Sequence, residues 1–301
     1  MENAKSGLKS FLATLMLIIG LGIVSYPTVS NWWNEIHSSQ MISTYARHIE
    51  EIDEDQLSTM LAAAAEYNRH IPERNVLYAM TSQEKRLYGN MLKLDESGLM
   101  GYIDIPKINV HIPIYHGTSD DVLQKAIGHI EWSSLPVGGK GSHAVLSGHR
   151  GLPKARLFTD LDKLKEGDEF TITILNRSMK YRVDQIRTVL PSELSDLTIV
   201  DGEDYCTLVT CTPYGVNTHR YLVRGKRIEG ADVSSATIRP DAYAVPISVT
   251  IPAFAIPTGL VMALMLTIAI RIRKMREQKA AEVRKRMMAE IQGGSVNAKN
   301  S

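Results

Sequence analysis

The chain has 301 residues, 44% of them hydrophobic, which is enough for one domain of roughly 150 residues with additional segments. Its 34 Lys and Arg residues nearly balance 33 Asp and Glu residues, giving a formal net charge of +1. Proteins that bind nucleic acids neutralise phosphates with an excess of basic residues. This composition lacks such an excess, so we exclude nucleic acid as a partner.

An uncharged apolar stretch near the N-terminus, residues 11–26, follows Lys5 and Lys9. Its length suits either the apolar region of a signal peptide or a short membrane anchor. No small-x-small cleavage pattern precedes Pro27, which favours an uncleaved anchor within residues 1–30. The positive residues ahead of the stretch predict a cytoplasmic N-terminus.

Residues 34–71 have a helical pattern in which Met41, Tyr45 and Ile49 recur on one face. Pro72 ends this pattern, and residues 73–95 are irregular. Two interpretations of the irregular part stay open: a solvated spacer, or a segment lying across a functional site. We therefore assign residues 31–97 to a helical stalk with a candidate lid.

Short segments with strand patterning, separated by Gly, Pro and Asp turns, fill most of the chain from about residue 98. They are residues 101–105, 110–115, 144–147, 170–175, 180–190, 205–211 and 219–225. Short helices are expected at residues 120–127 and 155–164. Many short strands with few helices predict a mainly β fold, a closed antiparallel β-barrel within residues 98–228.

A polar linker at residues 229–245 leads into a second apolar stretch, and residues 242–270 carry no charge. From about residue 251 this stretch offers about 20 residues, roughly 30 Å as a helix, which can cross a bilayer. We place a transmembrane helix at residues 246–271 and a basic cytoplasmic tail at residues 272–301. Two spans with both termini in the cytoplasm put the barrel outside the cell.

The stretch with the clearest chemistry is residues 205–225, where two strand patterns flank a turn rich in Pro, Gly and Asn. Cys211 closes the first strand and Arg220 opens the second, so a hairpin sets a thiol beside a guanidinium. A fixed positive charge favours the thiolate, and free cysteine is only a few per cent thiolate at neutral pH. Cys211 is therefore the candidate nucleophile.

The other cysteine, Cys206, is expected to be a small core residue. Five residues of strand separate it from Cys211 by roughly 16 Å, whereas a disulfide needs under about 7 Å between Cα atoms. Odd spacing also sends the two side chains to opposite faces of the strand. No zinc ligand set accompanies them, and we expect neither a metal nor a cofactor.

Nine histidines compete for the role of partner to Cys211. His149 ends an apolar strand in a Gly-His-Arg-Gly turn, where flanking glycines let the backbone expose an imidazole. His143 enters the same strand roughly 20 Å away, and His219 should face away from Arg220. His149 is therefore the candidate.

Three nearby polar residues are expected not to react. Thr210 is expected to pack or form a hydrogen bond rather than react. Asp160 and Asp162 are expected to lie in a solvated turn.

Three motifs in this order resemble the sortase family. TLVTC at residues 207–211 looks like the sortase TLxTC signature, LSGHRG at residues 146–151 resembles the sortase histidine motif, and Arg220 falls where the sortase arginine belongs. The resemblance extends from about residue 100 to residue 225.

The stretches GLPKARLFTD at residues 151–160 and CTPYGVNTHR at residues 211–220 are most similar to class C, pilus-building sortases. Two membrane spans around the domain are also similar to that class. One feature departs from it: class C sortases commonly carry an Asp-Pro-aromatic lid motif, and no Asp-Pro occurs in residues 73–95.

The resemblance implies a membrane-anchored cysteine transpeptidase with a sortase-type β-barrel. Cys211 would attack an LPxTG-like sorting signal between Thr and Gly to form a thioester, His149 would transfer protons, and Arg220 would stabilise the oxyanion or hold the peptide. The implied partners are pilin or surface proteins, with a lysine amine of a second pilin as acceptor.

The sequence bears on four alternative functions. In a tyrosine-phosphatase loop the cysteine and arginine lie closer in sequence than Cys211 and Arg220, and in a papain-type protease the cysteine begins a helix. A non-enzymatic envelope scaffold would explain the anchors but not the three motifs. A housekeeping sortase that joins proteins to a cell-wall precursor remains a rival within the family.

Overall fold

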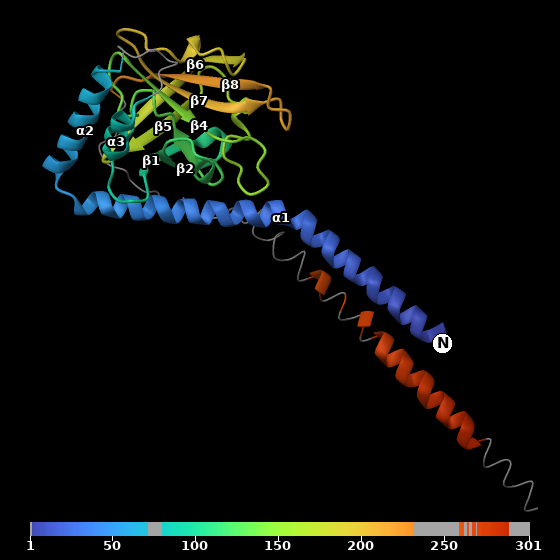
Figure 1. Ribbon diagram of the computed structural model, residues 1–301. Coiled ribbons are helices and arrows are strands. Elements are labelled where there is room, and N and C mark those ends of the chain that lie inside the picture. Colours follow the sequence, from blue (N-terminus) through green and yellow to red (C-terminus); the bar gives the residue numbers. More distant parts are fainter. Residues whose placement is uncertain are drawn as a thin grey trace, which may run out of the picture. The chain divides into compact units, whose positions relative to one another are not determined.

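The computed structural model describes residues 2–71, 80–230, 259–261, 264, 267–268 and 270–288. Contact clustering divides the chain into two units, one formed by Met1–Ser25 with Pro246–Ser301 and the other by Tyr26–Val245. The second unit contains a β-barrel with helices beside it (Figure 1). The α-helices are α1 (Glu2–Glu51), α2 (Glu54–Arg69), α3 (Ser82–Asn90) and α4 (Asp120–Leu123). Three short 3-10 helices are η1 (Pro106–Ile108), η2 (Leu161–Lys163) and η3 (Ser195–Leu197).

The strands close into a barrel in the order β1-β2-β3-β4-β7-β8-β6-β5, which confirms the predicted closed β-barrel. They are β1 (Leu99–Ile105), β2 (Val110–His116), β3 (Ile127–His129), β4 (Ser142–Ser147), β5 (Glu169–Ile174), β6 (Arg177–Val189), β7 (Asp204–Thr212) and β8 (His219–Arg227). All seven predicted strand segments are present. The three-residue strand β3 was missed, because the sequence around it was assigned to a helix that in fact ends at Leu123.

The barrel is not antiparallel throughout, as we had expected. β2 pairs with β3 and β4 pairs with β7 in parallel, while the other six pairings are antiparallel. Alternation of apolar and polar residues reports which face of a strand is buried but not which strand lies beside it. Parallel partners also need a long connection, and β5 and β6 lie in the connection between β4 and β7.

The predicted single helix over residues 34–71 is two helices. Asp53 has an extended backbone, with φ −61° and ψ 140°, and its side chain accepts a hydrogen bond from the Asp55 amide. An aspartate in this position caps the start of a helix. The chain therefore turns at Asp53, and α2 begins at Glu54.

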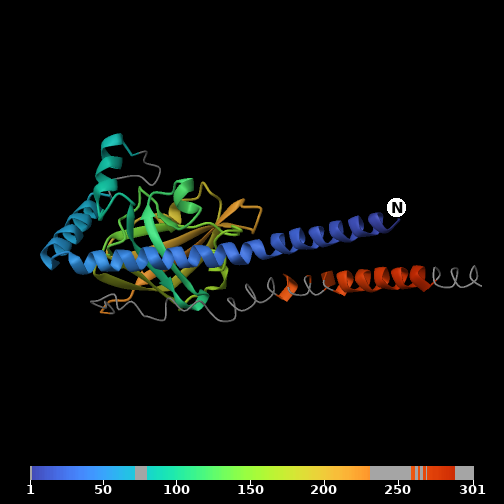
Figure 2. The ribbon, with the colours of Figure 1, turned by 90° about the horizontal axis from the view of Figure 1, so that it is seen from below.

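The predicted apolar face of the stalk does pack on the barrel. Tyr45 and Ile49 are buried in the main core, and Met41 packs against it. The Tyr45 hydroxyl donates to the Met100 carbonyl at 2.6 Å and accepts from the Leu175 amide at 2.7 Å. Figures 1 and 2 show this part of α1 running beside the barrel.

Part of the segment at residues 73–95 is regular rather than irregular. Thr81 and Glu84 form a capping box at the start of α3. Tyr88 of α3 is buried, and its hydroxyl lies 2.9 Å from Nδ1 of His129 and accepts from the Gly117 amide at 3.0 Å. The described part of the segment is thus fixed to the barrel and is not a solvated spacer, and residues 72–79 lie outside the described residues.

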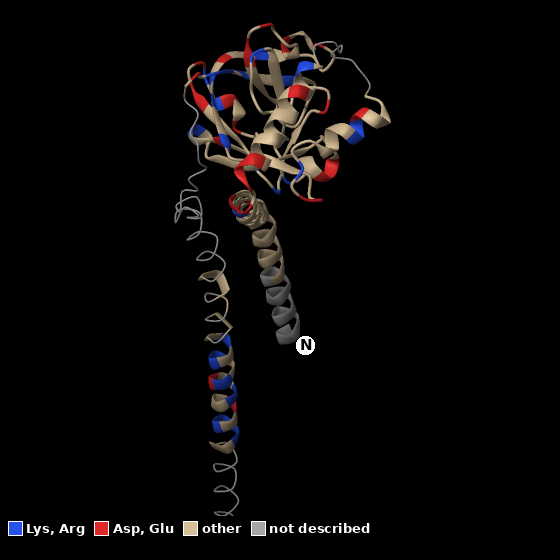
Figure 3. Cartoon of the chain, turned by 90° about the vertical axis from the view of Figure 1, so that its left-hand side faces the viewer, with Lys and Arg blue, Asp and Glu red and all other residues tan. Residues whose placement is uncertain are grey.

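One helix in the described part of the chain is long and apolar enough to cross a membrane, Leu15–Glu51, with a stretch of mean hydropathy 1.4. It includes most of the predicted N-terminal anchor. Most of the predicted second span, residues 246–271, lies outside the described residues. Residues 270–288 are helical, and Figure 3 shows Lys and Arg gathered along them.

Replacing Tyr45 by Phe should lower the free energy of unfolding by about 2 kcal/mol, because the Met100 carbonyl and the Leu175 amide each lose a buried partner. Urea unfolding of the full chain in detergent, followed by tryptophan fluorescence, measures the change. The matched control is Tyr214→Phe, since Tyr214 is exposed. Equal stability of the two variants would contradict a bracing role for the Tyr45 hydroxyl.

Candidate active site

Residue alternation along β7 gives the two cysteines different environments. Cys206 and Leu208 are fully buried in the barrel core, whereas Cys211 has the opposite parity and is partly exposed. Both cysteines are free thiols, so the predictions of no disulfide and of a core role for Cys206 are confirmed. Cys211 therefore points to the outer face of the barrel wall, near the end of its strand.

Arg220 lies directly across from Cys211 in the antiparallel pairing of β7 with β8. Opposite residues in such a pair share a face of the sheet, with Cβ atoms about 5 Å apart. The Nη1 atom of Arg220 donates to the carbonyls of Asn217 at 3.3 Å and His219 at 3.2 Å. His219 pairs with Thr212 and so belongs to the other face, as predicted.

The turn bearing His149 reaches the end of β7 from the other side, through the parallel pairing of β4 with β7. The last paired positions are Ser147 and Val209, and the Gly148 amide then donates to the Val209 carbonyl at 3.0 Å. His149 follows directly and lies just beyond this ladder.

The buried Thr210 hydroxyl fixes the same approach, because it donates to the Gly148 carbonyl at 2.7 Å. This contact confirms that Thr210 forms a hydrogen bond within the fold. The structure thus brings the turn that bears His149 to the end of β7, where Cys211 and Arg220 lie opposite each other.

Two other histidines in this region are buried. Both ring nitrogens of His143 are engaged: Nδ1 lies 2.8 Å from the Thr198 carbonyl oxygen and Nε2 lies 2.7 Å from Thr207 Oγ1. His129 is fully buried, with Nε2 2.8 Å from the Ser134 carbonyl oxygen. Burial lowers the pKa of each to about 4, so both rings are neutral near pH 7.

The turn after His149 is held against the end of the barrel. The Phe158 amide donates to the His149 carbonyl at 3.2 Å, and the fully buried Phe158 ring packs on Gly148 so closely that a Cβ there would come within 2.8 Å of it. Glycine before His149 is therefore required by close approach of an aromatic ring.

Both aspartates of this turn form ion pairs; Asp162 is exposed, as expected for a solvated turn, whereas Asp160 is partly buried. Asp162 on η2 binds Arg150, and Asp160 binds Arg156 and Lys163. These contacts lower the pKa of Asp160, although its partial burial opposes them. Arg150 was not singled out from the sequence, where only its place beside His149 distinguished it.

A small apolar cluster covers the outer face of the barrel near Cys211. Its buried members are Val145, Val189, Leu197, Val209 and Leu222, with Ile130, Trp132 and Leu194 packed against them. Val209 and Leu222 are paired across β7 and β8, two residues before Cys211 and two after Arg220. Cys211 and Arg220 thus lie beside an apolar cluster whose central members are buried.

The chain is similar to proteins of one known family. The family model described as Sortase domain matches residues 103–228. The crystal structure of sortase C1 from Streptococcus agalactiae is 56% identical over 63% of this chain and 98% of that one, with a TM-score of 0.61.

The chain belongs to the sortase family.

Two further relatives place it within that family. A sortase C from Clostridium perfringens, solved with the C-terminal cell wall sorting motif, is 42% identical over 63% of this chain and 98% of that chain, with a TM-score of 0.55. Sortase D of Bacillus subtilis is 31% identical over 131 residues, which are 42% of this chain and 63% of sortase D. The solved neighbours are class C sortases, which confirms the class suggested by the motifs.

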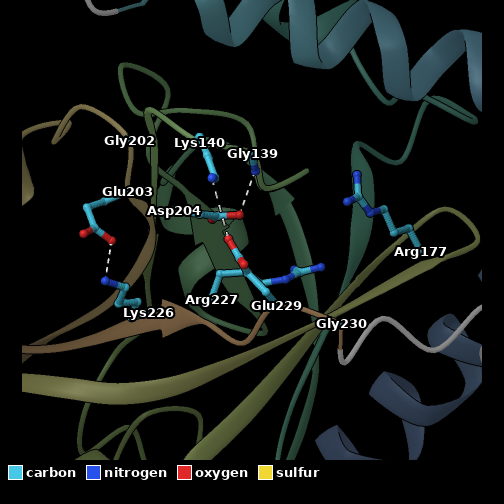
Figure 4. Close-up of a pocket in the computed structure, with 10 residues that line it drawn as sticks. All are labelled: Gly139, Lys140, Arg177, Gly202, Glu203, Asp204, Lys226, Arg227, Glu229 and Gly230. Carbon is cyan, nitrogen blue, oxygen red and sulfur yellow. Dashed lines mark hydrogen bonds and ion pairs between the residues drawn. The ribbon is translucent and has the colours of Figure 1, made fainter.

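This sortase also has a charged pocket of about 300 Å³ at the opposite end of β7 (Figure 4). Asp204, which begins β7, is seven residues and about 23 Å of strand away from Cys211. Its carboxylate accepts from the Gly139 amide at 2.7 Å and the Tyr181 hydroxyl at 3.2 Å. Burial raises the pKa of Asp204. None of the three sequence-predicted site residues lines this pocket.

Within the part of the sortase that the structure describes, no three His, Cys, Asp or Glu side chains are grouped to hold a metal ion.

The two cysteines should differ sharply in reactivity toward iodoacetamide. Cys211 is partly exposed and should be alkylated in the folded protein, while Cys206 is fully buried and burial raises the pKa of its thiol. Peptide mapping by mass spectrometry after a short exposure measures both sites, and unfolding in urea is the control that should expose both. Equal labelling of the folded protein would contradict the assigned faces of β7.

Acidification should destabilise this sortase between about pH 6.5 and pH 4. The pKa values of His129 and His143 are about 4 in the folded state, against 6.5 as the ordinary value, so the unfolded chain binds more protons in this range. Stability is full above pH 6.5 and falls by up to about 3 kcal/mol per histidine as the pH drops through 4.

Urea unfolding of the full chain in detergent at several pH values measures this dependence. His143→Gln should make it shallower, and His70→Gln, at an exposed position, should leave it unchanged. An identical pH dependence in His143→Gln and the wild type would show that His143 does not stay neutral in the folded protein.

Proposed function

We propose that this chain is a membrane-anchored class C sortase that uses Cys211 as nucleophile, His149 as proton-transfer group and Arg220 as oxyanion or peptide ligand. The observation that carries the proposal is that Cys211 and Arg220 are paired across β7 and β8, while the turn bearing His149 is hydrogen-bonded to Val209 and Thr210 of β7. Sortases are cysteine transpeptidases, and these are the groups that such a reaction needs.

The thiolate of Cys211 attacks the carbonyl carbon between Thr and Gly of an LPxTG-like sorting signal. The C–N bond breaks, His149 gives a proton to the leaving amine, and a thioester joins Cys211 to the Thr carbonyl. An incoming amine then loses a proton to His149 and attacks the thioester, which releases Cys211. The acceptor in this proposal is a lysine amine of a second pilin.

In this proposal Arg220 stabilises the negative charge that develops in the reaction. Its guanidinium carries several donors, and the described contacts of one of them, Nη1, are with carbonyls of its own turn. The carbonyl oxygen of the attacked bond becomes negative in the transition state, and a preorganised donor stabilises that charge.

The apolar cluster beside Cys211 and Arg220 supports a peptide substrate with apolar residues. The Leu and Pro of a sorting signal would lie against the partly exposed members of this cluster, Ile130, Trp132 and Leu194, so that the Thr carbonyl reaches Cys211. Binding of a C-terminal cell wall sorting motif is recorded for the Clostridium perfringens sortase C. We extend the same substrate class to this chain.

Membrane attachment follows from the apolar N-terminal helix, and we propose two spans with both termini in the cytoplasm. The basic residues within the helix at 270–288 support a cytoplasmic C-terminal tail. This topology places the barrel outside the cell, where pilin and surface proteins carry their sorting signals.

Incubating the full chain in detergent with an LPxTG-containing peptide should produce a thioester adduct on Cys211, seen as a mass increase that hydroxylamine removes. Cys211→Ala and His149→Ala should abolish adduct formation, while His143→Ala should retain it in the fraction that folds. Arg220→Ala should lose roughly a hundredfold in turnover, equivalent to about 3 kcal/mol of barrier. An adduct that forms in Cys211→Ala, or none in the wild type, would refute the proposed nucleophile.

The choice of acceptor separates a pilus sortase from a housekeeping one. We expect the adduct to transfer to a lysine side-chain amine of a pilin peptide faster than to a cell-wall precursor amine. The reverse preference would favour the housekeeping function, which the 27% identity over 221 residues to sortase A of Listeria monocytogenes keeps as the second candidate.

A further inference from the structure

We propose that Arg150 is a positioning residue that, together with Asp162 and Thr212, clamps the His149 turn to the end of β7. The inference rests on the proposed function, because it concerns how His149 and Cys211 keep the spacing that proton transfer requires. Arg150 follows His149 in sequence, and Thr212 follows Cys211. One guanidinium therefore joins the chain just beyond both groups.

The contacts of Arg150 are specific. Its Nη1 donates to Thr212 Oγ1 at 3.3 Å, and its Nη2 donates to Asp162 Oδ2. The Arg150 side chain is only 13% exposed, which is unusual for a cation and requires the paired carboxylate. Asp162 is fixed in turn by η2, whose Leu161 is fully buried in the core.

Residues on both sides of His149 are attached to β7. Before His149, Gly148 is bonded to both Val209 and Thr210 of β7. After His149, Arg150 is bonded to Thr212. His149 and Cys211 are thus each flanked on both sides by residues that bind the other strand, so neither can shift along its strand without breaking a contact.

The clamp lies on the opposite face of β7 from the reacting groups. Thr210 and Thr212 share one parity, and Cys211 with its neighbour Arg220 has the other. Arg150 therefore acts through the backbone of the His149 turn and does not touch the substrate. Its effect is on geometry, and a displacement of about 1 Å at a reacting group can cost a hundredfold in rate.

The test uses Thr212→Val in the full chain in detergent, because it removes one hydroxyl and leaves the Arg150–Asp162 pair intact. We expect amide hydrogen exchange at residues 149–157 to rise at least tenfold with little change in melting temperature. We also expect kcat for peptide cleavage to fall about tenfold to hundredfold with KM nearly unchanged. Thr212→Ser should restore both to within about threefold.

Two further variants sharpen the result. Arg150→Lys keeps the charge but offers a single compact group that cannot reach both partners, so it should behave like Thr212→Val. Thr171→Val, on β5 away from this turn, is the matched control and should change neither readout.

Unchanged hydrogen exchange in Thr212→Val would overturn the clamp whether or not the wild type forms an adduct. Faster exchange with unchanged kcat would also overturn it, by showing that the contact does not position His149. A wild type without an adduct refutes the proposed nucleophile instead, and hydrogen exchange then decides the clamp by itself.

Discussion

The parallel pairing of β4 with β7 is the constraint on which the rest of the site depends. Six consecutive positions, Ser142 to Ser147, lie against Asp204 to Val209. A slip of one residue in such a ladder would send every side chain to the other face. The hydrogen bonds from Gly148 and Thr210 carry this register past the end of β4, and so decide where the turn bearing His149 meets β7.

Burial divides the polar and reactive groups into two classes. Cys206 lies inside the barrel, where burial raises the pKa of its thiol well above the ordinary value. The rings of His129 and His143 are also buried and neutral, each with its nitrogens close to neighbouring oxygens. His143 pairs with Tyr205 and so shares the strand face of Cys211, but it is covered there. Cys211 and Arg220 lie at the strand ends and are partly exposed, so groups of the same chemical type differ in exposure through depth as well as parity.

The sequence predicted the individual strands better than it predicted which strands pair with each other. Short strands, the β7–β8 hairpin and the opposition of Cys211 to Arg220 follow from period-two patterning and turn residues, and all are present. The parallel partners of β2 and β4 were not predictable, since they depend on closure of the whole barrel. The break at Asp53 was missed because acidic residues around it also suit a continuous helix.

For the candidate site, motif resemblance selected His149, Cys211 and Arg220; the structure pairs Cys211 with Arg220 and brings the turn that bears His149 to the end of β7. Arg150 was not singled out, and Asp162 was assigned only to a solvated turn, because each resembles an ordinary surface charge in sequence. Their pairing is visible only when η2 folds back over the barrel end. Ion pairs between separate segments leave no periodic pattern in the sequence.

The outward position of Cys211 has a consequence for the size of what can react there. A group buried in the lumen of a barrel is reached only by a thin ligand that enters from one end. A thiol on the outer wall is reached sideways, so two large folded molecules can approach it in turn while the interior stays packed with apolar side chains. Large molecules can therefore reach the thiol while the barrel stays closed.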